Sequence, residues 1–175
     1  PEADPNFAMP FDGEGDYVDI PSLQYDGSHP LTIEVSVRPD GIPEQYARLV
    51  SLPEVYVVAN PTYPQFLAVA NEDPRRGFSI RAEHQFRPNQ NVYLACVYDG
   101  KQIELYVDGQ RQDGLRTFDS ETGELEFGTH PDIGLKDLLP DLGMTIGGNW
   151  KGEESFRGLI DEVRISNIAR YTEDF

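Results

Sequence analysis

Short apolar runs separated by turn-forming residues extend along almost the whole chain, and this pattern most constrains what the chain can fold into. The runs are about five to eight residues long, many of them alternate apolar with polar side chains, and Gly, Pro, Asp and Asn interrupt them. Short strands at regular spacing with turn signals between them are typical of a β-sandwich or a β-barrel. No segment keeps a helical period over about twelve residues. The sequence therefore predicts an all-β fold of two packed layers.

Two segments carry this pattern most clearly. In Leu31–Arg38 every second side chain is apolar, so we expect one face of this strand on a core and the other, with Thr32 and Glu34, in water. In Val92–Asp108 two β-rich runs flank Asp99-Gly100, which supplies the positive φ of a tight hairpin turn. The predicted strands are Phe7–Phe11, Asp16–Ile20, Leu31–Arg38, Arg48–Leu52, Glu54–Ala59, Gln65–Asn71, Phe78–His84, Val92–Tyr98, Gln102–Asp108, Met144–Ile146 and Phe156–Ser166.

The remaining long segment, Gln110–Gly143, is interpreted as an acidic connection with one small strand at Glu124–Phe127. Connections of this length tend to be functional or disordered.

Charge and length narrow the class of protein. The chain has 31 acidic and 14 basic residues and a net charge of -17, which argues against nucleic acid and anionic membrane surfaces as partners. No apolar stretch approaches the ~20 residues that span a bilayer, so we expect no membrane insertion.

Cys96 is the only cysteine and lies in an apolar run, which predicts a buried thiol. The 175 residues fit one domain, 7–175, after a linker at 1–6, and we expect a monomeric module of a longer protein.

Four sequence blocks in a fixed order resemble a known family. The blocks are Phe11–Val18 (FDGEGDYV), Leu31–Pro39 (LTIEVSVRP), Ala95–Gly109 (ACVYDGKQIELYVDG), and Ile146–Asn149 (IGGN) followed by Phe156–Ile165 (FRGLIDEVRI). Their order and content are similar to the laminin-G-like, pentraxin-like domains of the concanavalin A-like lectin/glucanase superfamily. The resemblance implies a jelly-roll sandwich of two antiparallel sheets in which the first and last strands pair.

A catalytic role is not expected. Glucanases of this fold resemble one another in acids that alternate along one strand, and a retaining hydrolase needs two carboxyl groups about 5 Å apart. Asp161 and Glu162 are adjacent, so in a regular strand they point to opposite faces. Glu124 and Glu126 alternate, but they lie in the long connection without a third acid in register. The three histidines lie near Pro or turn residues and suggest no triad.

The resemblance also implies a structural calcium ion between the N-terminal and C-terminal strands. Calcium takes six to eight oxygen ligands, from carboxylates and backbone carbonyls. Asp161 matches the C-terminal acid of the family, and Asp12, Asp16 and the carbonyl of Gly13 are the N-terminal candidates. The alternative is that Asp161 caps its strand through hydrogen bonds without metal.

Aromatic side chains are the candidate ligand-binding residues, because a sugar face stacks on an aromatic ring beside a few fixed polar groups. Trp150, the only Trp, follows Gly147-Gly148-Asn149 in an expected loop, where an exposed platform and ordinary packing are both open, and Tyr46, Tyr56 and Tyr63 could join it. The alternative for each tyrosine is ordinary strand packing.

We therefore expect a secreted or cell-surface binding module whose partner is a glycan or an extracellular protein. An adhesion domain without glycan binding is the alternative, and a glycoside hydrolase the less favoured one.

Overall fold

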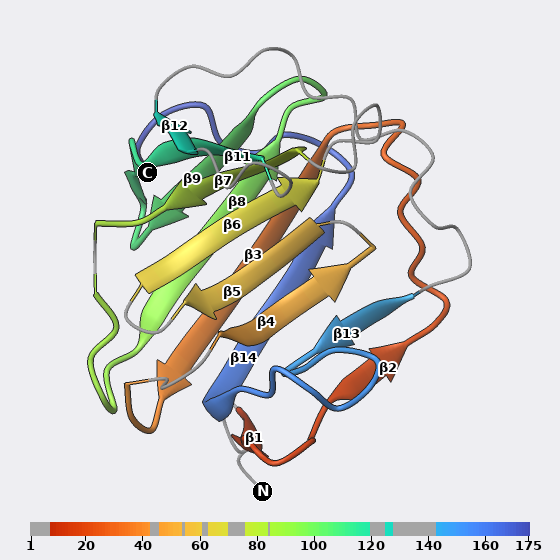
Figure 1. Ribbon diagram of the computed structural model, residues 1–175, viewed down its shortest axis with the longest axis vertical. Helices are drawn as coiled ribbons and strands as arrows, with labels where there is room; N and C mark the ends of the chain where they lie inside the picture. Colours follow the sequence, from red (N-terminus) through yellow and green to blue (C-terminus); the bar gives the residue numbers. More distant parts are fainter. Residues whose placement is uncertain are drawn as a thin grey trace, which may run out of the picture.

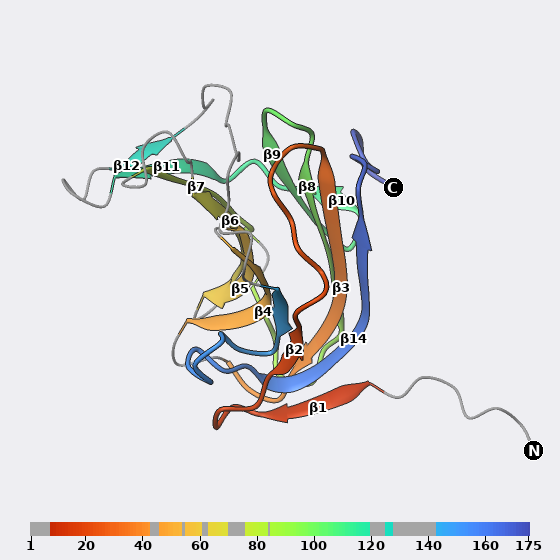
Figure 2. The ribbon, with the colours of Figure 1, turned by 90° about the vertical axis from the view of Figure 1, so that its right-hand side faces the viewer.

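The computed structural model describes residues 8–42, 46–53, 55–60, 63–69, 76–83, 85–119, 125–127 and 143–175. This part of the chain forms two antiparallel sheets packed face to face, as Figures 1 and 2 show, which confirms the jelly-roll sandwich. Among the described residues there is no helix, and hence none long and apolar enough to cross a membrane.

The first sheet has six strands in the order β1-β14-β3-β8-β9-β10. Their bounds are β1 Met9–Asp12, β14 Arg157–Ser166, β3 Leu31–Pro39, β8 Val92–Tyr98, β9 Ile103–Val107 and β10 Gln110–Arg111. The first and last strands pair as expected, with Met9 opposite Ile160 and Asp12 opposite Arg157.

The second sheet has eight strands in the order β12-β11-β7-β6-β5-β4-β13-β2. Their bounds are β12 Leu125–Phe127, β11 Leu115–Asp119, β7 Arg76–Arg81, β6 Tyr63–Val69, β5 Val55–Asn60, β4 Ala47–Leu52, β13 Met144–Ile146 and β2 Val18–Ile20. This sheet is strongly curved, and Figure 2 shows β11 and β12 bending away from the first sheet.

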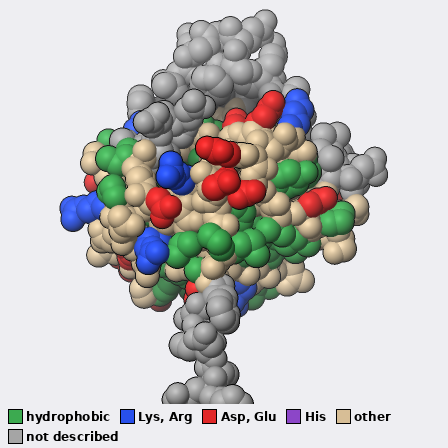
Figure 3. Space-filling model, turned by 90° about the horizontal axis from the view of Figure 1, so that it is seen from below, with side chains coloured by type: hydrophobic (Ala, Val, Ile, Leu, Met, Phe, Trp, Pro, Cys, Tyr) green, Lys and Arg blue, Asp and Glu red, His purple; other side chains and the backbone are tan. Residues whose placement is uncertain are grey.

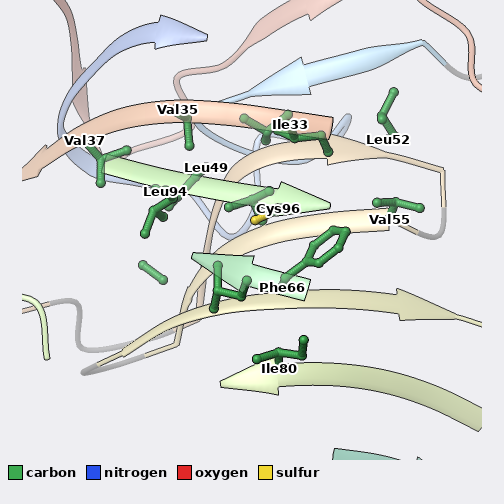
Figure 4. Packing of buried hydrophobic residues seen from close by; sticks show 14 of the residues in the cluster. Ile33, Val35, Val37, Leu49, Leu52, Val55, Phe66, Ile80, Leu94 and Cys96 are labelled. Carbon is green, nitrogen blue, oxygen red and sulfur yellow. The ribbon is translucent and has the colours of Figure 1, made fainter. Parts of the chain in front are cut away.

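The core lies between the sheets and takes alternate side chains from both. Figure 4 shows Ile33 and Val35 of β3 and Cys96 of β8 facing Leu49 of β4 and Phe66 of β6. Cys96 is fully buried, and burial raises the pKa of its thiol well above the ordinary value. The prediction of a buried cysteine is confirmed.

The interpretation of 110–143 as one long connection was wrong in part. The described residues of this segment include β10 and β11, which were not expected, and β12, which was expected from Glu124 onward. β11 pairs with β7 and thereby extends the curved sheet. Residues 120–124 and 128–142, like His84 and His130, lie outside the described residues.

The expectation that one face of β3 is in water was also wrong in part: Ser36 and Arg38 are partly exposed, but Thr32 and Glu34 are not. Thr32 and Glu34 are 0% and 1% exposed. The chain after β14 covers them: the Thr32 hydroxyl donates to the Ile168 carbonyl at 2.6 Å, and the Tyr171 hydroxyl donates to the Glu34 carboxylate at 2.7 Å. An alternating pattern identifies two faces of a strand, but it does not show which distant segment covers the second face.

The C-terminal strand departs from regular alternation as well. A bulge shifts the register between β14 and β3 from Asp161 to Arg164, and Glu162 has a φ of 51°. The expected opposition of the Asp161 and Glu162 side chains assumed a regular strand, and the strand is irregular at these positions. The Asp161 carboxylate accepts a hydrogen bond from the Glu162 amide at 2.8 Å, which agrees with the capping alternative.

Candidate functional site

A pocket of about 700 Å³ lies at the end of the sandwich where β3 ends and β14 begins. Three chain segments line it: the turn after β1, the chain between β3 and β4, and the chain that leads into β14. We call it the acidic pocket, because its lining includes four carboxylates and one guanidinium, from Asp12, Glu14, Asp40, Glu154 and Arg157. Figure 3, which views the molecule from below, shows Asp and Glu side chains gathered at this end.

The turn after β1 is fixed by its own polar groups. The Asp12 carboxylate accepts the Glu14 amide at 2.7 Å, and the Gly15 amide donates to the Ser155 hydroxyl at 3.2 Å. Gly13 has a φ of 80°, and a Cβ there would lie 3.0 Å from the Cβ of Arg157. Glycine therefore lets this turn lie directly against the start of β14.

A second turn, built around Asn149, positions the segment that leads into β14 and lies against the turn after β1. The Asn149 side-chain oxygen accepts the amides of Lys151 and Glu153, each at 2.9 Å, and the Asn149 amide donates to the Glu153 carbonyl at 3.0 Å. Glu154 and Ser155 follow immediately and line the pocket.

Tyr46 brings an aromatic ring to the same pocket. Burial raises the pKa of its phenol to about 12, against a smaller opposing effect of the Arg48 guanidinium. The hydroxyl is therefore protonated at neutral pH and can donate a hydrogen bond. Arg48 is held by Glu154, with its Nε 2.5 Å from the Glu154 Oε2, and its guanidinium lies 4.1 Å from the centre of the Tyr56 ring. The structure thus places Tyr46, Arg48, Glu154 and Tyr56 together.

Tyr63 is separate from this group. It pairs with Asn60 at the other end of β5, four residues from Tyr56, which corresponds to about 13 Å along the strand. The Arg81 guanidinium lies 3.8 Å from the centre of its ring, and its hydroxyl accepts the Gln85 side-chain amide at 3.1 Å.

Trp150 lies in the Asn149 turn, as the sequence suggested, but it is half-buried rather than exposed. Its indole Nε1 is buried and has no hydrogen-bond partner among the described residues. It does not contribute to the lining of the acidic pocket.

The expected calcium ligands divide into two places. Asp12, Gly13 and Asp16 share the turn after β1, where the Asp12 amide lies 3.4 Å from the Asp16 carboxylate. Asp161 pairs with Ser36 and lies four residues along β14 from Arg157, the partner of Asp12, which corresponds to about 13 Å. Calcium–oxygen bonds are about 2.3–2.6 Å long, so Asp161 and Asp12 do not share one ion in this arrangement. Within the described ranges, no three His, Cys, Asp or Glu side chains converge on a metal position.

Sequence reasoning missed several residues of the pocket. Glu14, Asp40 and the residues Glu154, Ser155 and Arg157 come from three separate segments, and no local spacing connects these segments. The available signal was the clustering of glycine and acids at 12–16 and 152–154, which marks turns without showing that the turns meet.

Comparison with known proteins identifies the family. A laminin G family model, described as the concanavalin A-like lectin/glucanases superfamily, matches residues 12–174. The chain belongs to this family. No curated protein matches this laminin-G-like domain.

Solved structures share its fold. A protein from Bacteroides ovatus, named as a candidate carbohydrate-binding protein, aligns over 89% of this chain and 42% of its own with a TM-score of 0.59 and 19% identity. This chain thus spans about two fifths of that protein. A CBM40 of the Ruminococcus gnavus IT-sialidase, bound to α2,3-sialyllactose, aligns over 90% of this chain and 95% of its own, with a TM-score of 0.59 and 12% identity. The LG1–3 region of the laminin α2 chain aligns over 91% of this chain and 31% of its own, with a TM-score of 0.56 and 17% identity.

Proposed function

We propose that this laminin-G-like domain is a non-catalytic carbohydrate-binding module that holds a neutral sugar in the acidic pocket. The observation that carries the proposal is the convergence, in one pocket of about 700 Å³, of the Tyr46 ring with carboxylates from three separate turns. Ligand pockets are commonly about 300–1,000 Å³ in volume, and they combine apolar or aromatic surface with a few fixed polar groups.

The chemistry of the lining favours a neutral ligand. Carboxylates accept hydrogen bonds from sugar hydroxyls, and these charge-assisted bonds are the stronger kind. Arg157 and the Tyr46 hydroxyl supply donors for ring and glycosidic oxygens. Four carboxylates around one guanidinium would repel a sugar that carries a carboxylate or sulfate. The carbohydrate-binding names of two proteins of this fold support a sugar as the ligand, and the neutral class is argued from the charge of this lining alone, since one of the two proteins binds a sialylated sugar. A secreted or cell-surface location would fit such a ligand.

A calcium ion at the turn after β1 belongs to the same proposal. Asp12, Asp16 and the carbonyl of Gly13 provide hard oxygen atoms within one tight turn. The ion would fix the turn and thereby the wall that Asp12 and Glu14 give to the pocket. Asp161 is left out of this ligand set because of its distance along β14.

Retention on arrays of neutral and acidic glycans tests the function. We expect binding to neutral glycans without release of reducing sugar, and a loss of about tenfold or more in affinity for Tyr46→Ala, because an aromatic platform contributes about 1–3 kcal/mol. Tyr17→Ala is the matched control, since Tyr17 is 40% exposed and does not line the pocket.

Three results would contradict the proposal. Binding restricted to acidic glycans would reverse the charge argument, and hydrolysis that is lost when Glu154 or Asp40 is neutralised would make the domain an enzyme. The absence of any glycan binding would favour an adhesion domain that recognises protein.

A further inference from the structure

A second pocket, of about 480 Å³, lies at the opposite end of the sandwich, where β3 begins and β14 ends. Leu31 and Ile165 contribute apolar walls from these two strands. Tyr25 and His29 come from the connection between β2 and β3, and Arg170 comes from the chain after β14. We call it the basic pocket.

The charge of this pocket is opposite to that of the whole chain. The described residues that line it include one arginine, Arg170, and no carboxylate, in a chain with 31 acidic residues against 14 basic ones. The nearest acid of His29 is Asp26, whose carboxylate is 3.8 Å from the His29 Nδ1 and lies outside the lining.

Arg170 is held in place but only partly neutralised. Its Nε lies 3.3 Å from one oxygen of the buried Glu34, and Arg164 Nη1 lies 3.6 Å from the other oxygen. One carboxylate therefore faces two guanidinium groups, which leaves an excess of positive charge beside the pocket. The Arg170 side chain is 36% exposed and lines the pocket, and a guanidinium has five N–H donors, more than the contact with Glu34 uses.

The apolar part of the pocket is preformed. Tyr25 is buried, its hydroxyl donates to the His29 carbonyl at 2.6 Å, and its ring meets the His29 ring edge-on with 5.1 Å between the ring centres. These contacts hold the connection against Leu31 and Ile165. A ligand would bind there without first ordering the wall.

We propose that the basic pocket is a second binding site, for a small amphipathic carboxylate. The carboxylate would accept hydrogen bonds from Arg170, and the apolar body would lie against Leu31, Ile165 and Ile168. A planar guanidinium fork matches a carboxylate in geometry as well as in charge. The site is independent of the sugar pocket, which lies at the other end of both strands.

The probe is 4-phenylbutyrate, with 4-phenylbutan-1-ol as the uncharged counterpart, titrated into the whole chain by 1H–15N NMR. We expect saturable shifts of the His29, Asn167 and Ile168 amides with a Kd on the order of millimolar for the carboxylate. The alcohol should bind at least about fivefold more weakly, because it lacks the charge-assisted contact.

Two variants of opposite charge at one exposed position distinguish an effect of charge on binding from an effect of the substitution on folding. Ile168 is 54% exposed and lines the pocket, so both Ile168→Glu and Ile168→Lys should fold. Both variants remove the same apolar contact, so we expect Ile168→Glu to bind 4-phenylbutyrate about tenfold more weakly than Ile168→Lys. Arg170→Gln should also weaken binding, whereas Arg111→Gln, which pairs with Glu104 and does not line the pocket, should change it less than about twofold.

Several results would overturn the site. These are equal affinity for the acid and the alcohol, equal effects of the two Ile168 variants, shifts centred on the acidic pocket, or no saturable shift with either probe.

Discussion

At the residue scale, the buried Glu34 carboxylate shows how far a local pattern can be trusted. The alternation in β3 placed Glu34 on the face opposite to the core, and the structure agrees on the face. The Glu34 carboxylate accepts hydrogen bonds from the hydroxyls of Tyr93 and Tyr171, and it forms an ion pair with Arg170. These partners come from β8 and from the chain after β14, so no spacing near Glu34 could have predicted its burial.

Glu34→Gln should lower the free energy of unfolding by about 2–4 kcal/mol, because a neutral amide keeps the shape of the side chain but leaves its partners poorly satisfied. Urea unfolding measures the change. Arg164→Gln is the control: its side chain is 62% exposed, so its loss should cost less than about 1 kcal/mol. Equal effects of the two variants would mean that the buried network does not stabilise the fold.

At the element scale, most strands were predictable to within a few residues, whereas β10, β11 and the irregularities of the strands were not. Val92–Tyr98 and Met144–Ile146 match the predicted bounds, because each is a compact β-rich run. The bulge in β14 carries no such signal, since Glu162 is a non-glycine residue with positive φ and no Gly or Asn marks the position. The sequence identified only some residues of the acidic pocket, because the others also lack a local signal. Asp12, Gly13 and Tyr46 line it, but the acids that face them come from turns that only the tertiary fold brings together.

The bulge at Glu162 predicts an effect on stability that is opposite to the effect expected from strand propensity alone. Valine is a better strand former than glutamate, yet Glu162→Val should destabilise the domain by about 1–2 kcal/mol, because a β-branched residue tolerates a φ of 51° poorly. Glu162→Gly should stay within about 1 kcal/mol of the wild type. Urea unfolding of both variants checks this, and a stabilising valine would mean that the strand is regular at this position.

At the scale of the whole molecule, the two sheets and their common core follow from the sequence, but the pockets at the two ends depend on loops. The pairing of β1 with β14 was expected from the family resemblance, and it places the turn after β1 beside the start of β14. Trp150, Tyr63 and Asp161 lie away from the acidic pocket, because candidate residues chosen by type carry no information on which turns meet.

Calcium should stabilise the whole domain if the turn after β1 binds it. A concentration of 100 times Kd adds about 2.7 kcal/mol, which corresponds to roughly 5–10 °C in Tm for a domain of this size. EDTA should reverse the rise in a thermal melt. Asp16→Asn should abolish the difference, whereas Asp161→Asn should retain it. A Tm that is unchanged by calcium and EDTA would refute the metal proposal.

Alkaline pH should destabilise the domain. Burial is the main cause that raises the pKa of Tyr25, Tyr46, Tyr93 and Tyr106 above the ordinary value of 10. Above pH 10 the unfolded chain loses these protons while the folded chain keeps them, so stability is fully present below pH 10 and falls as the pH rises. Each group can contribute up to about 1.4 kcal/mol per pH unit. Tm measured from pH 8 to 11 should fall, and Tyr25→Phe should reduce the slope; a flat profile would contradict this.

The pairing of β1 with β14 also has a consequence for biosynthesis. A ribosome releases residues 9–12 long before residues 157–160, so the first strand must wait for its neighbour while the rest of the polypeptide is made. Until then β3 has an unpaired edge on the side that β14 will occupy, and such edges invite association with other nascent chains. Translation speed and chaperone access during that interval should therefore influence the yield of this protein.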